Sequence, residues 1–311
     1  MNKEFSHTPV LYEEVLKYLS PKNGEVFIDA TFGAGGYTYG ILNAAQCQVL
    51  SLDRDNSVLP KAELIKKEFA DRFHFAHSNF SDLDHQAVKH GFPQVDGIVF
   101  DLGVSSMQID DAARGFSFMY NGPLDMRMDT TSGISAIDIV NTYSEKELAD
   151  ILYHFGDENK SFKIAKAIVE RRTQQPIETT SELAEIIRRT IGHRNSKIDP
   201  ATKSFQAIRI AVNDELNQLQ NALHASVNLL KKGGRLVVVT FHSGEDTIVK
   251  KFFRDICGKV GRSNRHMPVL ENKIEQPHFK ELHKGVITAT NLEVERNVRA
   301  RSAKMRVILK L

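Results

Sequence analysis

A glycine-rich turn with the sequence DATFGAGG, at residues 29–36, is the first candidate for chemistry. It follows the apolar run VFIDA at 26–30. Glycines after a strand let the backbone approach a ligand closely, and the next helix offers N–H groups at its start. Asp53 ends the next apolar run, VLSLD, where a carboxylate can accept hydrogen bonds from ribose hydroxyls. The spacing therefore predicts a site for a nucleoside-containing cofactor, with a tight turn that binds no ligand as the alternative.

The identity of that cofactor depends on the glycine spacing. The turn does not match the dinucleotide fingerprint GxGxxG, because Thr38 stands where the fingerprint requires its third glycine. It also keeps Asp29 at the end of the strand. This arrangement is similar to the first motif of S-adenosylmethionine-dependent methyltransferases, whose cofactor has no pyrophosphate. We therefore expect S-adenosylmethionine rather than NAD.

Short apolar runs alternate with helical patterns over the first hundred residues, which favours parallel βαβ units in a doubly wound sheet. The expected strands are 26–30, 49–53, 73–77 and 96–103. From about 105 to 200 helical patterns replace them. These patterns lie at 144–156, 160–172 and 179–192. The last begins with Thr179 and Glu182 at the spacing of a capping box. The middle of the chain is therefore predicted to be a helical insertion.

The sheet pattern returns in the last third of the chain. Apolar residues at steps of three and four predict one long helix from Phe205 to Leu230, and strands are expected at 234–241 and 304–311. We expect an α/β methyltransferase domain that is split in sequence by a helical substrate-recognition domain. The predicted boundaries are 1–108 and 205–311 for the two parts of the α/β domain and 109–204 for the insertion.

Composition argues against several other classes of protein. The 311-residue chain has a formal net charge of +2, so any basic surface for nucleic acid must be local. Cys47 and Cys257 lie far apart with no CxxC partner, which argues against a disulfide framework or a structural zinc site. Neither a signal peptide nor a membrane span is apparent. We expect a cytoplasmic protein that needs no metal.

Several longer sequence blocks carry a specific resemblance. They are HTPVL (7–11), DATFGAGG, LDRD (52–55), DLGVSSMQIDDAARGFSFMYNGPLDMRMD (101–129), FQAIRIAVNDEL (205–216), GGRLVVVTFHSGEDTIVK (233–250) and RNVRARSAKMR (296–306). Together they resemble the bacterial 16S ribosomal RNA cytosine-N4 methyltransferases, the RsmH or MraW family. The resemblance implies a Rossmann-like class I methyltransferase fold with an inserted helical domain. It also implies methylation of the exocyclic N4 of one cytidine in the decoding region, with 16S rRNA of the small ribosomal subunit as the partner.

The resemblance also implies a set of cofactor-binding residues. The family positions carry over to Gly35, Gly36, Tyr37, Asp53, Phe80, Asp101 and Gln108. Two positions depart from the family: Tyr37 stands where members often have His, and Gly244 stands where they have Leu. Phe80 follows the third predicted strand, so it could stack on the adenine ring or simply belong to the core.

Asp101 is the candidate catalytic residue, because it ends the fourth predicted strand, where open α/β sheets bind their ligands. Cytosine N4 is a poor nucleophile, since its lone pair is delocalised into the ring. A carboxylate that accepts one N4–H, together with the carbonyl of Leu102, would localise that pair and aim it at the methyl group. Other amino-methyltransferases carry a proline pair here, and this chain has Gly103 and Val104.

The target base must therefore be stacked by another part of the chain. The candidates are Phe116, Phe118 and Tyr120, and their alternative is packing of the insertion.

Polar residues after the strand at 234–241 suggest either a catalytic triad or a metal site. They are His242, Ser243, Glu245 and Asp246. Their spacing fits neither a nucleophile elbow nor a usual metal site. We expect Ser243 to cap the following helix, with both acids in its first turn. His242 is a candidate to line the substrate pocket.

Further candidates for substrate contact lie on the predicted long helix and in basic clusters. Arg209 and Asn213 are four positions apart, largely off the apolar stripe, so they could face the active-site cleft or solvent. The clusters KIAKAIVERR, IIRRTIGHRNSK and RNVRARSAK could hold RNA phosphates, or lie on solvated helices.

The sequence leaves two rival functions open. One is the same chemistry on DNA or protein. The other is a non-catalytic RNA-binding assembly factor, against which the glycine turn, Asp53 and Asp101 argue.

Overall fold

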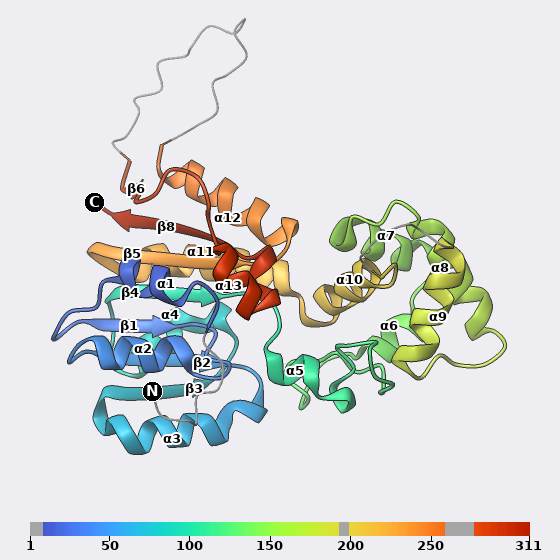
Figure 1. Ribbon diagram of the computed structural model, residues 1–311, viewed down its shortest axis with the longest axis horizontal. Helices are drawn as coiled ribbons and strands as arrows, with labels where there is room; N and C mark the ends of the chain where they lie inside the picture. Colours follow the sequence, from blue (N-terminus) through green and yellow to red (C-terminus); the bar gives the residue numbers. More distant parts are fainter. Residues whose placement is uncertain (1–8, 193–198, 259–276) are drawn as a thin grey trace, which may run out of the picture. The chain divides into compact units, whose positions relative to one another are not determined.

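The computed structural model describes residues 9–192, 199–258 and 277–311. The chain forms two compact units, of which one contains Met1–Gly103 and Leu216–Leu311 and the other contains Val104–Glu215. Figure 1 shows the chain coloured along its sequence. The unit boundaries differ from the predicted domain boundaries at 108 and 205, most of all at the second one.

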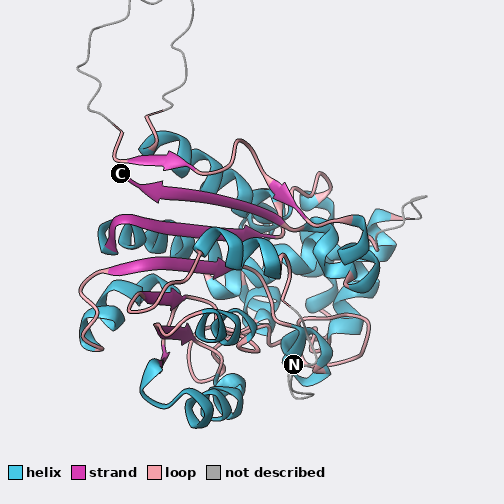
Figure 2. Ribbon diagram, turned by 60° about the vertical axis from the view of Figure 1, so that its left-hand side comes forward, coloured by secondary structure: helices cyan, strands magenta, loops and turns pink. Residues whose placement is uncertain are grey.

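The first unit is built on one sheet. Its strands are β1 (Val26–Asp29), β2 (Gln48–Asp53), β3 (Phe73–His77), β4 (Val95–Asp101), β5 (Leu230–Thr240), β6 (Phe279–Glu281), β7 (Ile287–Thr288) and β8 (Lys304–Lys310). The order is β3-β2-β1-β4-β5-β8-β6, and β7 also pairs with β8. Strands β1 to β5 run parallel, whereas β8 is antiparallel to β5. This is the expected Rossmann-like class I methyltransferase fold; all six predicted strands are present, and Figure 2 shows the sheet in magenta.

Helices flank this sheet. They are α1 (Tyr12–Leu19), α2 (Gly36–Ala44), α3 (Leu59–Phe69), α4 (Leu83–Lys89), α11 (Glu215–Leu229), α12 (Ser243–Ile256) and α13 (Asn291–Arg296). One core cluster joins apolar residues of α4, α11 and α12 to the sheet. Its strand residues lie in register across the sheet, in the row Leu50, Ile28, Ile98, Leu236 and Ile308, all of them fully buried. Helices cover both faces of a parallel sheet, and this packing fixes the positions of the strand ends.

The second unit is helical around its own apolar core. Its helices are α5 (Ser106–Asp110), α6 (Ala136–Thr142), α7 (Glu145–Gly156), α8 (Ser161–Arg172), α9 (Thr180–Ile191) and α10 (Thr202–Asn213). The capping box of α9 is present, since Thr179 Oγ1 accepts from Glu182 N–H and the Glu182 carboxylate accepts from Thr179 N–H. The predicted helical character of the insertion is confirmed.

The prediction of one long helix from Phe205 to Leu230 is wrong. Helix α10 ends at Asn213 and α11 begins at Glu215, with Asp214 between them in the left-handed region at φ 49°. Aspartate tolerates this conformation better than most residues do. The apolar stripe continues across the break because both helices bury one face, but Phe205 and Ile208 pack in the helical core whereas Leu219 and Leu223 pack in the sheet core.

No helix in the described part of the chain is long and apolar enough to cross a membrane.

Candidate active site

The glycine turn joins β1 to α2 in a geometry that side chains would obstruct. Gly35 is the N-cap of α2 at φ 79°, and a Cβ there would lie 2.7 Å from Ile65 Cδ1. A Cβ on Gly36 would strike the ring of Pro9. The N–H groups of Gly36 and Tyr37, at the start of α2, have no acceptor among the described residues. These N–H groups can therefore donate to a ligand.

Asp53 ties this turn to the end of β2. Its Oδ2 accepts from Gly33 N–H at 2.8 Å and its Oδ1 accepts from Asp55 N–H at 2.9 Å. Burial raises the pKa of the Asp53 carboxyl, while these two hydrogen bonds oppose the rise. Each oxygen keeps a further lone pair, which is what recognition of ribose hydroxyls requires.

Asp29 is a buried carboxyl beneath the same turn. It accepts from Thr38 Oγ1 at 2.7 Å, Thr38 N–H at 3.2 Å and Thr31 N–H at 3.3 Å, and Thr38 Oγ1 also lies 2.7 Å from Ser51 Oγ. Burial raises its pKa to about 6, against the effect of these bonds. Asp29 is not among the predicted site residues, although the Asp-Ala-Thr triplet that opens the turn is a signal that could mark it. Its contacts show that it fixes the start of α2.

Asp101 ends β4 and differs from the other two carboxyls. Its N–H donates to Thr31 Oγ1 at 2.6 Å, which holds the strand end beside the turn. Its Oδ1 is buried and makes no hydrogen bond within the described residues. Burial, followed by the nearby charges of Asp29 and Glu245, raises its pKa to about 8. Because buried polar atoms are normally paired, this oxygen marks a place for a ligand.

Phe80 follows β3, as expected. Its side chain is half-buried against the sheet core, and its ring meets the ring of Phe100 edge to face with 5.9 Å between centroids. The packing supports the core interpretation for one part of the ring. The exposed part remains a candidate surface for the adenine.

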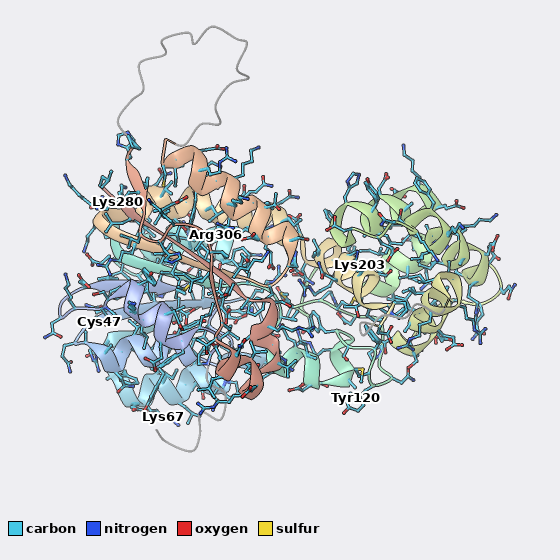
Figure 3. The ribbon with its side chains drawn as sticks, turned by 45° about the horizontal axis from the view of Figure 1, so that its top comes forward. Cys47, Lys67, Tyr120, Lys203, Lys280 and Arg306 are labelled. Atoms are coloured by element: carbon cyan, nitrogen blue, oxygen red, sulfur yellow. The ribbon has the colours of Figure 1, made fainter. Side chains whose placement is uncertain are left out.

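Among the polar residues after β5, Glu245 makes the hydrogen bonds that fix the start of α12. The N-cap of α12 is His242, so the expectation that Ser243 caps this helix is wrong. Glu245 Oε2 accepts from Phe241 N–H at 2.8 Å, and Glu245 Oε1 lies 3.0 Å from His242 Nε2. Asp246 pairs with Arg306 of β8, which is labelled in Figure 3. His242 Nδ1 accepts from Glu245 N–H at 3.4 Å, whereas its buried Nε2 makes no hydrogen bond within the described residues.

Three other predicted site residues lie in the helical unit, namely Gln108, Arg209 and Asn213. Gln108 is the N3 residue of a capping box, in which its Oε1 accepts from Ser105 N–H at 2.9 Å. Arg209 makes a bidentate, largely buried ion pair with Glu215, with N···O distances of 2.8 and 2.7 Å. The alternative of a solvated face for Arg209 is therefore wrong. Gln108 belongs to the helical unit, whereas the glycine turn belongs to the sheet unit.

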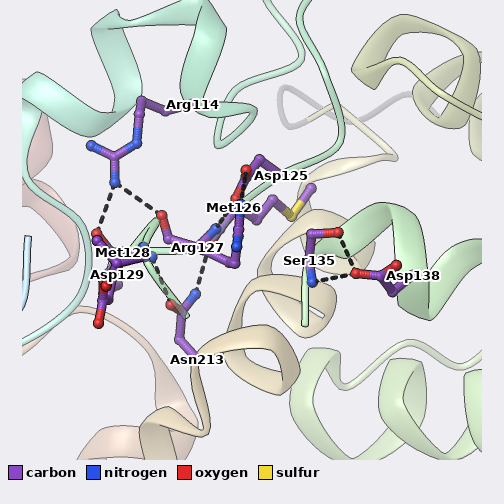
Figure 4. A network of polar contacts seen from close by, with 10 residues as sticks. Arg114, Asp125, Met126, Arg127, Met128, Asp129, Ser135, Asp138 and Asn213 are labelled. Carbon is purple, nitrogen blue, oxygen red and sulfur yellow. Dashed lines mark hydrogen bonds and ion pairs between the residues drawn. The ribbon is translucent and has the colours of Figure 1, made fainter. Parts of the chain in front are cut away.

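Asn213 joins the end of α10 to the loop at 126–128. Its Oδ1 accepts from Met128 N–H at 2.9 Å and its Nδ2 donates to Met126 C=O at 2.7 Å. Arg114 donates to the carbonyls of Arg127 and Met128, each at 2.9 Å. Figure 4 shows these bonds converging on the loop, where Met126 has a φ of 59°. Asn213 is buried and makes these contacts within the unit, so the alternative that it faces solvent is also wrong.

The aromatic candidates for base stacking separate into two groups. Phe118 packs edge to face on Phe205 at 4.8 Å, and Phe116 packs against the helical core with the Arg114 guanidinium 5.6 Å from its ring centroid. Tyr120, labelled in Figure 3, is 66% exposed.

Parts of two predicted sequence blocks lie outside the described residues. They are the end of the basic cluster at 186–197, from residue 193 onward, and His7 and Thr8 of the block HTPVL.

Comparison with known proteins decides the family. Residues 4–311 match the MraW methylase family. The chain belongs to the MraW methylase family. A ribosomal RNA small subunit methyltransferase H of Rickettsia akari is 50% identical, covering 98% of this chain and 99% of that protein. One from Acidiphilium cryptum is 48% identical, covering 100% and 99%. A solved rRNA methylase from Streptococcus thermophilus superposes with a TM-score of 0.42 at 10% identity, covering 96% and 93%.

S-adenosylmethionine is the cofactor of this methylase. The residues present fit it. The N–H groups of Gly36 and Tyr37 can donate to it, Asp53 can hold its ribose, and the buried Oδ1 of Asp101 can pair with one of its polar groups.

Asn213→Ala should lower the free energy of unfolding by about 3 kcal/mol, because it leaves the N–H of Met128 and the C=O of Met126 buried without partners. Denaturant titration of the cofactor-free protein measures this. Asn43→Ala is the control, since that side chain is exposed and bonds Tyr39 of its own helix. Equal stability of the two variants would contradict a structural role for Asn213.

Proposed function

We propose that this methylase transfers a methyl group to the exocyclic N4 of a cytidine in the decoding region of 16S ribosomal RNA, within the small ribosomal subunit and in the cytoplasm. Relatives about half identical over nearly the whole chain are named as ribosomal RNA small subunit methyltransferases, which supports the RNA substrate. The choice of an amino nitrogen as methyl acceptor rests on the buried Oδ1 of Asp101, which makes no hydrogen bond to any described residue.

The proposed cofactor contacts follow the glycine turn. Gly35 permits the turn, Gly36 and Tyr37 contribute N–H donors, and Asp53 holds the ribose. Phe80 would cover the adenine with the exposed part of its ring. Gln108, in the helical unit, stays a prediction as a cofactor residue. S-adenosylmethionine supplies an electrophilic methyl group on a sulfonium.

Asp101 would orient the acceptor and take up its proton. Its carboxylate accepts a hydrogen bond from one N4–H, which localises the nitrogen lone pair. The N4–CH3 bond forms as the S–CH3 bond breaks, and one N4 proton passes to Asp101. The pKa of about 8 for this carboxyl suits a base that works near neutral pH. His242, fixed by Glu245 at the neighbouring strand end, would contact the base.

Arg209 and Asn213 would act on the substrate indirectly, by holding the loop at 126–128 and the turn at Asp214 in shape. Direct contact of either residue with RNA stays a prediction.

The test is transfer of radiolabelled methyl from S-adenosylmethionine to undermethylated small ribosomal subunits and, separately, to naked 16S rRNA, followed by nucleoside analysis. Label in N4-methylcytidine supports the proposal. Label in another nucleoside overturns the N4 assignment, and label only in naked RNA overturns the subunit as substrate. Cofactor binding with no transfer to either RNA would favour an assembly factor or a DNA or protein acceptor.

A further inference from the structure

A short segment before α1 lies directly on the glycine turn. It consists of Pro9, Val10 and Leu11, and we refer to it as the strap. The ring of Pro9 occupies the space in which a side chain on Gly36 would lie. Gly36 therefore has two roles. Its N–H, at the start of α2, can donate to the cofactor, and its missing side chain leaves room for the strap. Any movement of the strap would change the packing of the turn.

Two side chains from distant parts of the sequence fasten the strap. The Tyr37 hydroxyl donates a hydrogen bond to Val10 C=O. Glu293, on α13 near the end of the chain, accepts from Leu11 N–H through Oε1 at 2.6 Å. The two bonds hold the same peptide group, the one between Val10 and Leu11, through its carbonyl and through its N–H.

The backbone of the strap needs this support. Leu11 is fully buried and has a φ of 55°, a conformation that costs a leucine roughly 1–2 kcal/mol. Its C=O accepts from Val15 N–H at 2.8 Å, so the same residue also starts α1. A strained residue persists only where its surroundings hold it, and here the Glu293 carboxylate and the buried leucine side chain do so.

These contacts change the role of Tyr37. Tyr37 is only 3% exposed and its hydroxyl is bonded to the strap, so we expect the cofactor to meet Tyr37 through the backbone N–H and not through the hydroxyl. We propose that Tyr37 and Glu293 are positioning residues that clamp the strap onto Gly36, and thereby keep the N–H groups of Gly36 and Tyr37 aimed at S-adenosylmethionine. This inference rests on the cofactor site proposed above.

Binding of S-adenosylhomocysteine by calorimetry, without RNA, is the first test. Tyr37→Phe removes only the hydroxyl, and Glu293→Ala removes the acceptor for Leu11 N–H. Each should raise the Kd by about tenfold, because a tenfold change corresponds to the free energy of about one hydrogen bond. With saturating S-adenosylmethionine, the methyl-transfer rate should stay within about twofold of the parent, because the proposed clamp acts on cofactor binding and not on the transfer step.

Matched variants separate positioning from general damage. Tyr39→Phe, on the same helix, removes a hydroxyl that donates to the exposed Glu68, and it should leave the Kd unchanged. Glu293→Gln keeps an oxygen acceptor for Leu11 N–H and should restore most of the affinity lost in Glu293→Ala. The double variant Tyr37→Phe/Glu293→Ala should bind about as weakly as the weaker single variant, since either loss releases the same strap.

Different failures have different meanings. Parent-like Kd values in Tyr37→Phe and Glu293→Ala overturn the clamp while leaving the cofactor site intact. A lower transfer rate at saturating cofactor with an unchanged Kd also overturns it. Failure of the parent protein to bind S-adenosylhomocysteine would overturn the cofactor site and the clamp together.

Discussion

Replacing Asp101 with Ala is expected to lower the rate of methyl transfer by about a thousandfold, the range associated with loss of a general base. Asp101 Oδ1, at the end of β4, is buried without a hydrogen bond in the part of the chain that the structure describes, and Thr31 fixes the backbone of the same residue. Alanine removes both the acceptor that orients N4 and the group that takes its proton. Single-turnover transfer with saturating cofactor and RNA measures the loss.

Asp101→Asn separates the two contributions. Asparagine keeps an oxygen acceptor of the same size but cannot take up a proton. If orientation alone matters, this variant retains most of the rate; if proton uptake matters, it is as slow as alanine. Asp84→Asn, an exposed acid in the first turn of α4, is the control for a change of charge. A fully active Asp101→Ala protein would remove this residue from the mechanism.

The same asparagine variant tests the environment of the carboxyl. The folded protein holds the Asp101 proton up to a pKa of about 8, whereas an unfolded chain releases it near its ordinary pKa of about 4. Between these values the folded state binds the extra proton, so the contribution of Asp101 to stability falls as pH rises. The stability of Asp101→Asn relative to the parent should therefore increase from pH 5 to 8 and level off above. Urea unfolding of cofactor-free protein across this range measures it, and a constant difference would contradict the raised pKa.

The strands and the capping boxes could be predicted because their signals are local. Apolar runs bounded by polar residues mark β1 to β5 and β8, and the pair Thr179 and Glu182 marks α9. Asp53 and Asp101 could be placed at strand ends for the same reason, since a parallel sheet brings its carboxyl ends to one edge. The position of these residues thus follows from the order of the elements alone.

The errors arise where a residue's partner is distant or the pattern is ambiguous. The helical period is equal in α10 and α11, so it cannot show that Asp214 turns the chain from one core to another. His242 caps α12 because its Nδ1 accepts from Glu245 N–H while the Glu245 carboxylate accepts from His242 N–H, and N-cap preferences do not favour histidine for this role. The bond from Leu11 to Glu293 joins opposite ends of the chain, and no local signal indicates it.

Asp53 illustrates how one side chain serves both the fold and the cofactor. Asp53→Ala should weaken S-adenosylhomocysteine binding by about a hundredfold, because two hydrogen bonds from ribose to a charged acceptor contribute about 3 kcal/mol. Alanine also removes the acceptor for Gly33 N–H, so part of the loss would come from the turn itself. Asp53→Asn keeps one oxygen for Gly33, and its Kd should fall between those of the parent and Asp53→Ala. Calorimetry measures both, and an Asp53→Ala protein with parent affinity would show that the ribose is held elsewhere.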